Sequence, residues 1–397
     1  MSLRKALVKY MAVLTLLLGV ASGPSYAGVP VNPDENFVIA SVMIASPGDE
    51  LYSKLGHAFL RMQCPSHKMD FCFTYESEDA AQKVFSFLSG TLKMGMQGIP
   101  TKEFLKHYAE EGRRVSQYTL NLPVSVKQNM WRILDRYVAE GMELPYDYME
   151  RGCAYSVYRV IREAGEDRHF TFGIWPDDFS LTRREIVCSQ LDDAPWTRLF
   201  LNIITNGPID DEVSYDEKVI TPKSLIQVLE ITKVDGKPLV GENPVEILPL
   251  KSQKEGGAPV TPLLVAFVLF IVTLTCGLMM KNSIMLPLVI LQSVLGVFVS
   301  YLIFLSTLCA TEWSWLIIPY NPLPLVFWKW RRFWELPYSI LLAGWCFVIY
   351  FGGSYLMDPS LILFALTLSL SYFFDYIIRK GLTIPTFQHK LTNLKPI

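Results

Sequence analysis

The stretch "GHAFLRMQCPSHKMDFCFTYES", residues 56–77, decides the fold of the amino-terminal part of the chain. Its two halves, "GHAFLRMQ" and "DFCFTYES", are apolar and aromatic segments of strand length, and the polar loop "CPSHKM" joins them. So short a connection allows only antiparallel neighbours. The sequence therefore predicts an antiparallel strand pair, in which Glu76 or a residue next to it lies opposite His57.

His57 begins the first of these strands, where a rigid element can hold an imidazole in place. A slip of one residue in the strand pairing would exchange the two faces of the sheet. Glu76 and Tyr75 therefore both remain candidates for the polar group that orients the His57 ring. The other histidines lie in a predicted loop, in polar surroundings or in the carboxy-terminal tail: His67, His107, His169 and His389.

A cysteine stands at the start of a helical pattern in "YMERGCAYSVYRV", residues 148–160. Val157, Val160, Ile161 and Ala164 share one helix face with Cys153. The thiol would then lie in the first turn, where unpaired backbone N–H groups and the helix dipole favour a thiolate. With His57 as the base, Cys153 is a candidate nucleophile for ester or amide carbonyls.

Other functions for the cysteines are packing, disulfide formation and metal binding. Cys64 and Cys72 flank the hairpin loop, so both a disulfide and two free thiols stay open. Neither Cys153 nor His57 belongs to a motif with metal-ligand spacing, so we expect no metal and no other cofactor. The remaining cysteines fit core packing: Cys188, Cys276, Cys309 and Cys346.

The composition indicates a membrane protein. Of the 397 residues 51% are hydrophobic and only 19% are charged. The net charge of −2 offers no basic surface for phosphate backbones, so we do not expect a nucleic-acid partner.

The chain divides into segments of different character. Residues 1–27 resemble a signal peptide, residues 28–250 a globular exported domain, residues 251–261 a polar linker, residues 262–380 a transmembrane domain and residues 381–397 a cytoplasmic tail. Four apolar stretches are predicted to span the membrane: Pro262–Met280, Ile284–Leu308, Leu336–Leu356 and Pro359–Ile378. The fold class predicted from this pattern is an α+β exported domain, with a small antiparallel sheet and several helices, followed by a helical membrane domain.

The segment Ala310–Trp328 is long enough to cross a bilayer, but its three prolines would break a regular helix. Counting it as a crossing places the basic residues Lys329, Arg331, Arg332 and Arg379 on the cytoplasmic side. A re-entrant segment is the alternative. We therefore expect about five spans, with the exported domain in the periplasm and the protein in the inner membrane.

Four stretches of the sequence resemble a known family: "GHAFLRM", "FLKHYAEEGRRVSQYTLNL", "PYDYMERGCAYSVYRVI" and "NGPIDDEVSYDEKVITPKSLIQVL". With the apolar tail that follows, they are similar to the Lnb family of Bacteroidota, whose members are membrane-bound lipoprotein N-acyltransferases. The resemblance implies a permuted papain-like (NlpC/P60-like) domain, with the family histidine at His57 and the nucleophile at Cys153. It also points to Arg113 or Arg114, either as a phosphate contact or as a surface charge.

The resemblance implies that Cys153 takes an acyl chain from a phospholipid as a thioester. The chain then passes to the α-amino group of the lipidated amino-terminal cysteine of a diacylated lipoprotein. One departure concerns the residue before the nucleophile, which is often Asn in the family and is Gly152 here.

Two rival functions remain. A Cys–His pair defines the nucleophile and not the acceptor, so a membrane-anchored cysteine hydrolase acting on a peptidoglycan amide or a lipid ester is one alternative. A non-catalytic membrane protein of the same fold is the other.

Overall fold

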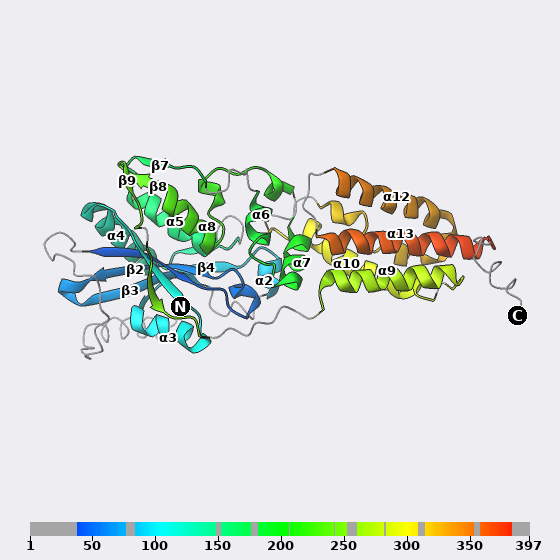
Figure 1. Cartoon of the computed structure of the whole chain (residues 1–397), viewed down its shortest axis with the longest axis horizontal. Coiled ribbons are helices and arrows are strands. Elements are labelled where there is room, and N and C mark those ends of the chain that lie inside the picture. Colours follow the sequence, from blue (N-terminus) through cyan, green and yellow to red (C-terminus); the bar gives the residue numbers. More distant parts are fainter. Residues whose placement is uncertain are drawn as a thin grey trace, which may run out of the picture. The chain divides into compact units, whose positions relative to one another are not determined.

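The computed structural model describes residues 38–76, 84–147, 152–175, 182–205, 207–241, 243–251, 260–281, 283–308, 314–352 and 358–382. It places a sheet with flanking helices in the amino-terminal part and helices in the carboxy-terminal part (Figure 1). The expected signal peptide, most of the linker and residues 383–397 of the tail lie outside the described residues.

An antiparallel sheet forms the centre of the amino-terminal part, called the exported part here because the sequence predicts its export. Its strands follow the order β10-β5-β1-β2-β3-β4-β6. Consecutive residues in the middle of the central strands β2 and β3 are buried, as expected for a sheet that is covered on both faces. The strands are β1 (Ile39–Ala45), β2 (His57–Cys64), β3 (Met69–Glu76), β4 (Lys93–Pro100), β5 (Val115–Thr119), β6 (Glu143–Pro145) and β10 (Val245–Leu248).

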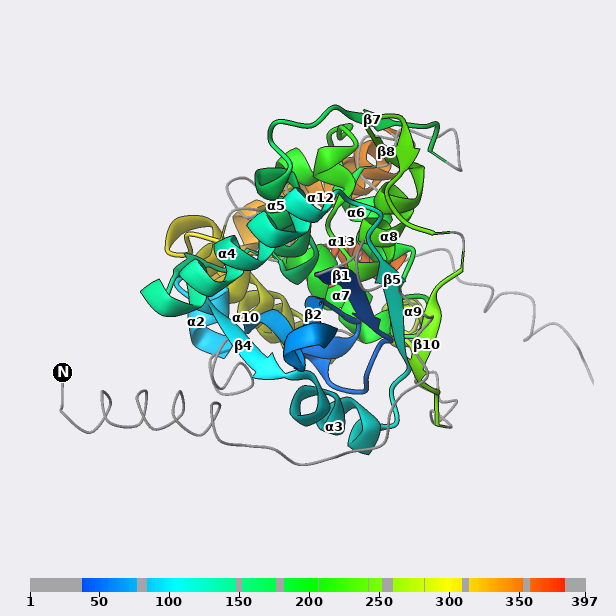
Figure 2. The ribbon, with the colours of Figure 1, turned by 90° about the vertical axis from the view of Figure 1, so that its left-hand side faces the viewer.

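The two faces of this sheet pack against different helices. Ala58, Leu60 and Met62 belong to the large core that also contains buried residues of α4 (Val124–Glu140), α5 (Cys153–Ala164) and α8 (Pro222–Ile231). Phe59 and Cys72 point to the opposite face and pack against Phe104 and Tyr108 of α3 (Thr101–Glu111). Figure 2 shows α3 on one side of the sheet and α4 and α5 on the other.

The predicted hairpin is confirmed, and its register excludes the disulfide. Strands β2 and β3 are antiparallel, and Cys72 lies opposite Arg61 while Cys64 lies opposite Met69. The two thiols therefore point to opposite faces of the sheet. Both are free: the Cys64 Sγ lies 3.2 Å from His67 Nδ1, and the Cys72 Sγ lies 3.4 Å from Thr101 Oγ1. A Cys64–Cys72 disulfide was the wrong alternative.

A smaller sheet and further helices complete the exported part. Strands β7 (Phe170–Phe172), β8 (Thr232–Val234) and β9 (Lys237–Pro238) pair in that order. Asp235 and Gly236 between β8 and β9 both have positive φ angles, 51° and 81°, as a type I′ hairpin turn requires. The remaining α-helices are α2 (Val84–Leu88), α6 (Arg183–Cys188) and α7 (Pro195–Ile204).

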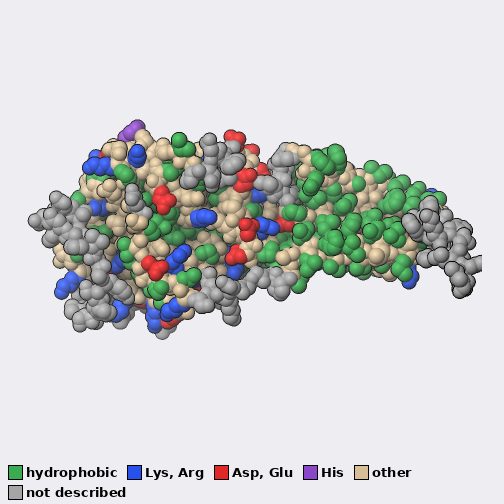
Figure 3. Space-filling view, viewed as in Figure 1, with side chains coloured by type: hydrophobic (Ala, Val, Ile, Leu, Met, Phe, Trp, Pro, Cys, Tyr) green, Lys and Arg blue, Asp and Glu red, His purple; other side chains and the backbone are tan. Residues whose placement is uncertain are grey.

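The carboxy-terminal part is apolar and helical. Among the described residues three helices are long and apolar enough to cross a membrane: α10 (Met285–Phe304), the stretch Trp328–Phe351 that contains α12 (Arg331–Phe351), and α13 (Pro359–Arg379). A shorter apolar helix, α9 (Pro262–Leu278), packs closely on α13, because a Cβ at Gly277 would lie 2.0 Å from the Phe374 ring. Hydrophobic side chains cover much of the visible face of these helices (Figure 3).

The segment between α10 and α12 is not a regular helix. Its described residues form η7 (Trp315–Ile317), α11 (Leu323–Val326) and η8 (Trp328–Trp330). None of these is long enough to span a bilayer, in agreement with the effect expected of the prolines. Its backbone carbonyls are satisfied by side chains: Gln292 Nε2 donates to Pro319 O at 2.7 Å, and Tyr338 Oη donates to Ile318 O at 2.8 Å.

Contacts at the helix ends show where this irregular segment runs. Ser306, just after α10, donates to Leu88 O of the exported part at 2.6 Å. Arg331, at the start of α12, instead pairs with Asp375 near the end of α13 at 3.1 Å. The start of α13 lies at the exported end, because Asp358 pairs with Arg198 of α7 at 3.6 Å. The irregular segment therefore runs from the exported end of the bundle to the opposite end.

Candidate active site

His57 is held at the start of β2 by the turn before it. Gly56 has a φ of 85°, and a Cβ there would lie 2.7 Å from Ala45 O, so the turn strongly favours glycine. The half-buried imidazole stacks on Phe59, with 5.9 Å between the ring centroids. Phe59 in turn packs on Phe104 and Tyr108 of α3, so these aromatic side chains support the His57 ring through Phe59.

A threonine and a glutamate contact one nitrogen of the His57 ring. His57 Nε2 lies 2.7 Å from Thr74 Oγ1 and 3.7 Å from Glu76 Oε1. Thr74 Oγ1 donates to Glu76 Oε1 at 3.4 Å, so Thr74 links the ring to the carboxylate. With Nε2 occupied, Nδ1 is the nitrogen left to act on a proton. The register thus brings Glu76 to His57, whereas Tyr75 is buried on the opposite face of the sheet.

Cys153 is the first residue of α5, and extended Gly152 is its N-cap. The face predicted for this helix is confirmed, since Val157, Val160 and Ile161 are all buried in the large core. The half-buried Cys153 thiol lies near the backbone N–H of Ala58, which favours the thiolate form and so lowers the pKa of the thiol. The sulfur therefore lies beside the residue that follows His57, and α5 and β2 bring the two candidate residues together. Among the described residues the thiol and the imidazole make no direct hydrogen bond.

Burial sets the charge state of this pair. Burial, and to a smaller extent the positive charge of the Arg113 guanidinium, lower the pKa of His57 to about 4. Burial also raises the pKa of the Cys153 thiol, although the backbone N–H groups of Ala58, Ala154 and Cys153 partly oppose that rise. The helix start does stabilise a thiolate as the sequence suggested, but desolvation outweighs it. The resting site is a neutral thiol beside a neutral imidazole.

Of the two arginines singled out from the sequence, Arg113 belongs to the site. Its buried guanidinium donates to Ser46 O at 2.7 Å, pairs with Glu111 at 3.1 Å and lies 4.9 Å from the centre of the Tyr108 ring. Arg114 is exposed. Arg113 thus holds the chain after β1 and places a positive charge near His57.

The site lies at the end of the sheet that faces the apolar helices. Leu55, two residues before His57, and Tyr146 pack against one hydrophobic cluster. Burial raises the pKa of Tyr146, and the nearby Cys153 raises it further. That cluster also contains Leu302 of α10 and Leu308. Residues next to both candidate catalytic side chains therefore contact the helical part of the chain.

Comparison with protein families assigns the exported part. Residues 35–183 match the family model of the Lnb N-terminal periplasmic domain. This part of the chain belongs to the Lnb family. Comparison with curated proteins and with solved structures gives no match. The matched range contains His57, Thr74, Glu76, Arg113 and Cys153, so the whole candidate site lies in the Lnb domain. The chain is a membrane protein with a periplasmic domain.

The other candidate residues do not join this site. In the Lnb domain His67 contacts Cys64, and His107 pairs with Glu111 at 3.2 Å on the surface of α3. The described residues contain no group of three or more His, Cys, Asp or Glu side chains that could hold a metal ion. Cys309 and His389 lie outside the described residues.

Thr74 was missed from the sequence, although a signal for it existed. In β3, Thr74 and Glu76 are two residues apart and so share a face. The register that brings Glu76 to His57 therefore also brings Thr74 to the same ring, and the hydroxyl has the shorter reach to Nε2.

Proposed function

We propose that this protein is a lipoprotein N-acyltransferase, which moves an acyl chain from a phospholipid to the α-amino group of a lipoprotein's lipidated amino-terminal cysteine. The observation that carries the proposal is the position of the Cys153–His57 pair. It lies in an Lnb domain, at the end of the sheet that packs against apolar, membrane-length helices. Both substrates of such a reaction are anchored in a membrane.

In the first half of the reaction, Cys153 takes the acyl chain. His57 Nδ1 accepts the thiol proton while Sγ attacks the carbonyl carbon of a phospholipid ester. Backbone N–H groups at the start of α5, which already lower the pKa of the thiol, stabilise the oxyanion. When the carbon–oxygen ester bond breaks, the imidazolium returns the proton to the leaving alcohol. The products are a lysophospholipid and a thioester on Cys153.

In the second half, the lipoprotein amine replaces the sulfur. The free amine attacks the thioester carbonyl, His57 takes a proton from the nitrogen, and the carbon–sulfur bond breaks. The proton then returns to the Cys153 sulfur, so that the enzyme is restored and an amide is formed. Neither half needs a metal or another cofactor, and water in place of the amine would make the same site a hydrolase.

Thr74 and Glu76 act as positioning residues in this scheme. The Thr74 contact holds Nε2, which keeps the ring in the orientation that presents Nδ1 to the sulfur. Glu76 stabilises the imidazolium that forms during proton transfer, because its carboxylate lies 3.7 Å from Nε2. Desolvation raises the pKa of Glu76 itself.

The helical part serves to bring the site to the lipid. We infer five crossings of the inner membrane, with α9, α10, α12, α13 and the irregular segment as the spans and the Lnb domain in the periplasm. Tethering raises the effective concentration of both acyl partners. Large apolar side chains on the loop before β2 and on α2 are exposed and would enter the lipid headgroup region: Leu51, Tyr52, Val84 and Phe85.

The decisive experiment is intact-mass analysis of the full-length protein purified with native lipids. Wild type is expected to carry a fatty-acyl mass increment that hydroxylamine removes. Cys153→Ala should lack it, and Cys64→Ala, which removes the thiol beside His67, should keep it. An unmodified wild type that also fails to acylate a diacylated lipopeptide would reject the proposal. Acylation without transfer to the amine would favour the hydrolase.

A further inference from the structure

The helical part contains an apolar groove that the catalytic scheme does not use. It lies between the second half of α12 and the irregular segment, and its volume is about 400 Å³. This volume is in the range of small-molecule binding sites. No charged side chain of the described residues lines it. Its walls include Trp315, Ile318, Leu341, Gly344, Trp345 and Val348.

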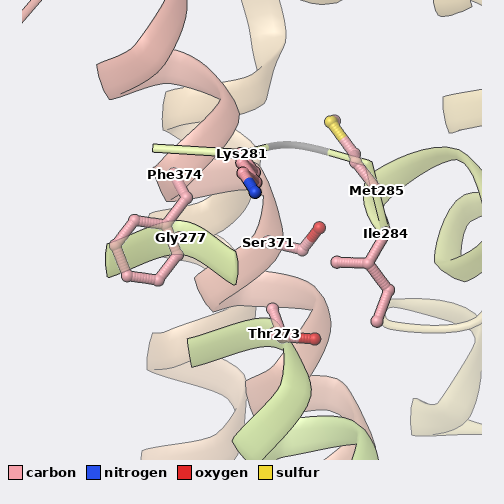
Figure 4. A pocket seen from close by; sticks show the side chains of 7 residues that line it. All are labelled: Thr273, Gly277, Lys281, Ile284, Met285, Ser371 and Phe374. Atoms are coloured by element: carbon pink, nitrogen blue, oxygen red, sulfur yellow. The ribbon is translucent and has the colours of Figure 1, made fainter. Parts of the chain in front are cut away.

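A second cavity shows what ordinary imperfect packing looks like in the same bundle. It lies between α9, α10 and α13, where Thr273, Gly277 and Ser371 line it (Figure 4). Its volume is about 10 Å³, room for about one water molecule. The groove on α12 is larger by more than an order of magnitude, so it is not a packing defect of this kind.

Gly344 leaves the floor of the groove open. It stands in the middle of α12, and a Cβ built there would meet no atom of the described residues within 4 Å. Glycine inside a helix destabilises it by roughly 1 kcal/mol relative to alanine. Neither a close helix contact nor a positive φ explains this glycine, whereas an occupant lying against the helix backbone does.

The groove lies in the half of the bundle nearer the Lnb domain. Helix α12 begins at the opposite end, where Arg331 contacts Asp375, so its second half lies toward the exported end. Residues 341–352 cover about 16 Å at a rise of about 1.5 Å per residue. This length is about half of a hydrocarbon core of roughly 30 Å, which is the depth of one leaflet.

We propose that this groove binds one acyl chain of a phospholipid in the periplasmic leaflet. Its apolar walls, its length and its depth fit an extended hydrocarbon chain, and its indole side chains, of which Trp315 is 45% exposed, provide broad surfaces for methylene groups. The inference goes beyond the proposed function, because binding in the groove requires neither Cys153 nor His57.

Photolabelling of the full-length protein in vesicles tests this site. The probe is phosphatidylethanolamine with a diazirine in its acyl chain, and labelled peptides are identified by mass spectrometry. We expect labelling of peptides around 315–318 and 341–352, in wild type and equally in Cys153→Ala. Gly344→Leu would fill the groove and should lower that labelling about tenfold, the loss expected when about two buried methylene groups are displaced.

Ala343→Leu is the matched control, because Ala343 is exposed on the same turn of α12 and does not line the groove. It should label like wild type. Val348→Phe, which fills the groove one turn further along α12, gives a second test if Gly344→Leu folds poorly. Equal labelling of all three variants would overturn the proposal and show only general contact with lipid. Loss of the Cys153 acyl adduct with labelling intact would instead count against the proposed function alone.

Discussion

The Lnb domain contains two thiol–imidazole pairs, and they differ in everything except residue type. Cys64 and His67 are in direct contact at 3.2 Å, on a short turn where the histidine is exposed. Cys153 and His57 make no direct hydrogen bond. Cys153 begins helix α5 and lies near backbone N–H groups, whereas His57 begins strand β2 and contacts Thr74. A close approach of sulfur and nitrogen is therefore not what distinguishes the candidate site. What distinguishes the Cys153–His57 pair is the set of residues that hold both side chains in place, together with the position of the pair beside the apolar helices.

Removal of the histidine should give the largest difference in acylation rate between the two thiol–imidazole pairs. We expect His57→Ala to slow formation of the Cys153 acyl adduct by about 10² to 10⁴-fold, the usual contribution of a general base. His67→Ala should change it by less than about twofold, because His67 lies beside Cys64, at the other end of β2 from His57. Quenched-flow or timed intact-mass measurements give both rates. Equal losses of acylation rate in the two variants would show that the two thiol–imidazole pairs do not differ in function.

Thr74→Val sharpens the comparison, because it removes one hydroxyl and keeps the shape of a buried side chain. The His57 ring then loses the partner of Nε2, and we expect acylation to slow by about tenfold with a near-normal melting temperature. Thr74→Ser should restore most of the rate. A Thr74→Val enzyme with an unchanged rate would show that Thr74 does not position the ring.

The acid limb of the pH profile tests the charge state of the pair. A general base works only when it is deprotonated, so acylation should fall as the pH drops through the pKa of His57, about 4. The rate should be nearly constant from about pH 5 to 8. Arg113→Gln removes a cause of the low pKa and should move the midpoint upward, while burial keeps it below the ordinary value of 6.5. A wild-type midpoint near 6.5 would contradict the conclusion that burial lowers the pKa of His57.

The smallest effect on acylation is expected from substitutions that weaken contact with the lipid surface. Phe85 of α2 is 83% exposed, and Phe85→Glu should lower acylation from vesicle phospholipid by about three- to tenfold without loss of stability. Met69→Glu is the control, since Met69 is also exposed but lies at the turn that carries Cys64. Activity on a detergent-dispersed donor should be unchanged in both. Equal effects on vesicles would remove the argument that the site end faces lipid.

The sequence predicted the parts of the site that depend on periodicity. The loop length placed Glu76 or a neighbouring residue opposite His57, and residues spaced by one helical turn gave the buried face of α5 that begins at Cys153. The catalytic roles of His57 and Cys153 stay a prediction. The fate of Cys64 and Cys72 was left open because the outcome depends on which face each thiol occupies, and this changes with a one-residue shift. Thiolate stabilisation was overestimated because desolvation of Cys153 depends on tertiary packing that no local pattern records.

The helical part was predictable to a different degree. Four apolar stretches were recognised, and α9, α10, α12 and α13 lie within or close to them. The path of the irregular segment could be argued only from charge placement, because prolines say where a helix stops and not where the chain goes next. Backbone carbonyls of this segment accept hydrogen bonds from Gln292 and Tyr338, which belong to other helices. The path of the segment could therefore not be predicted from its own sequence.

The hydrogen bonds between Ser306 or Thr307 and the chain at Leu88 and Ser89 join residues 218 positions apart. During synthesis the Lnb domain emerges long before the helix that completes this joint. Until α10 is in place, the apolar cluster beside Leu55 and Tyr146 lacks Leu302 and Leu308 and stays open to water. Packing at the end of the sheet that carries the candidate site is therefore complete only when α10 is in place, so a chain truncated before α10 would leave this apolar cluster exposed and prone to aggregation.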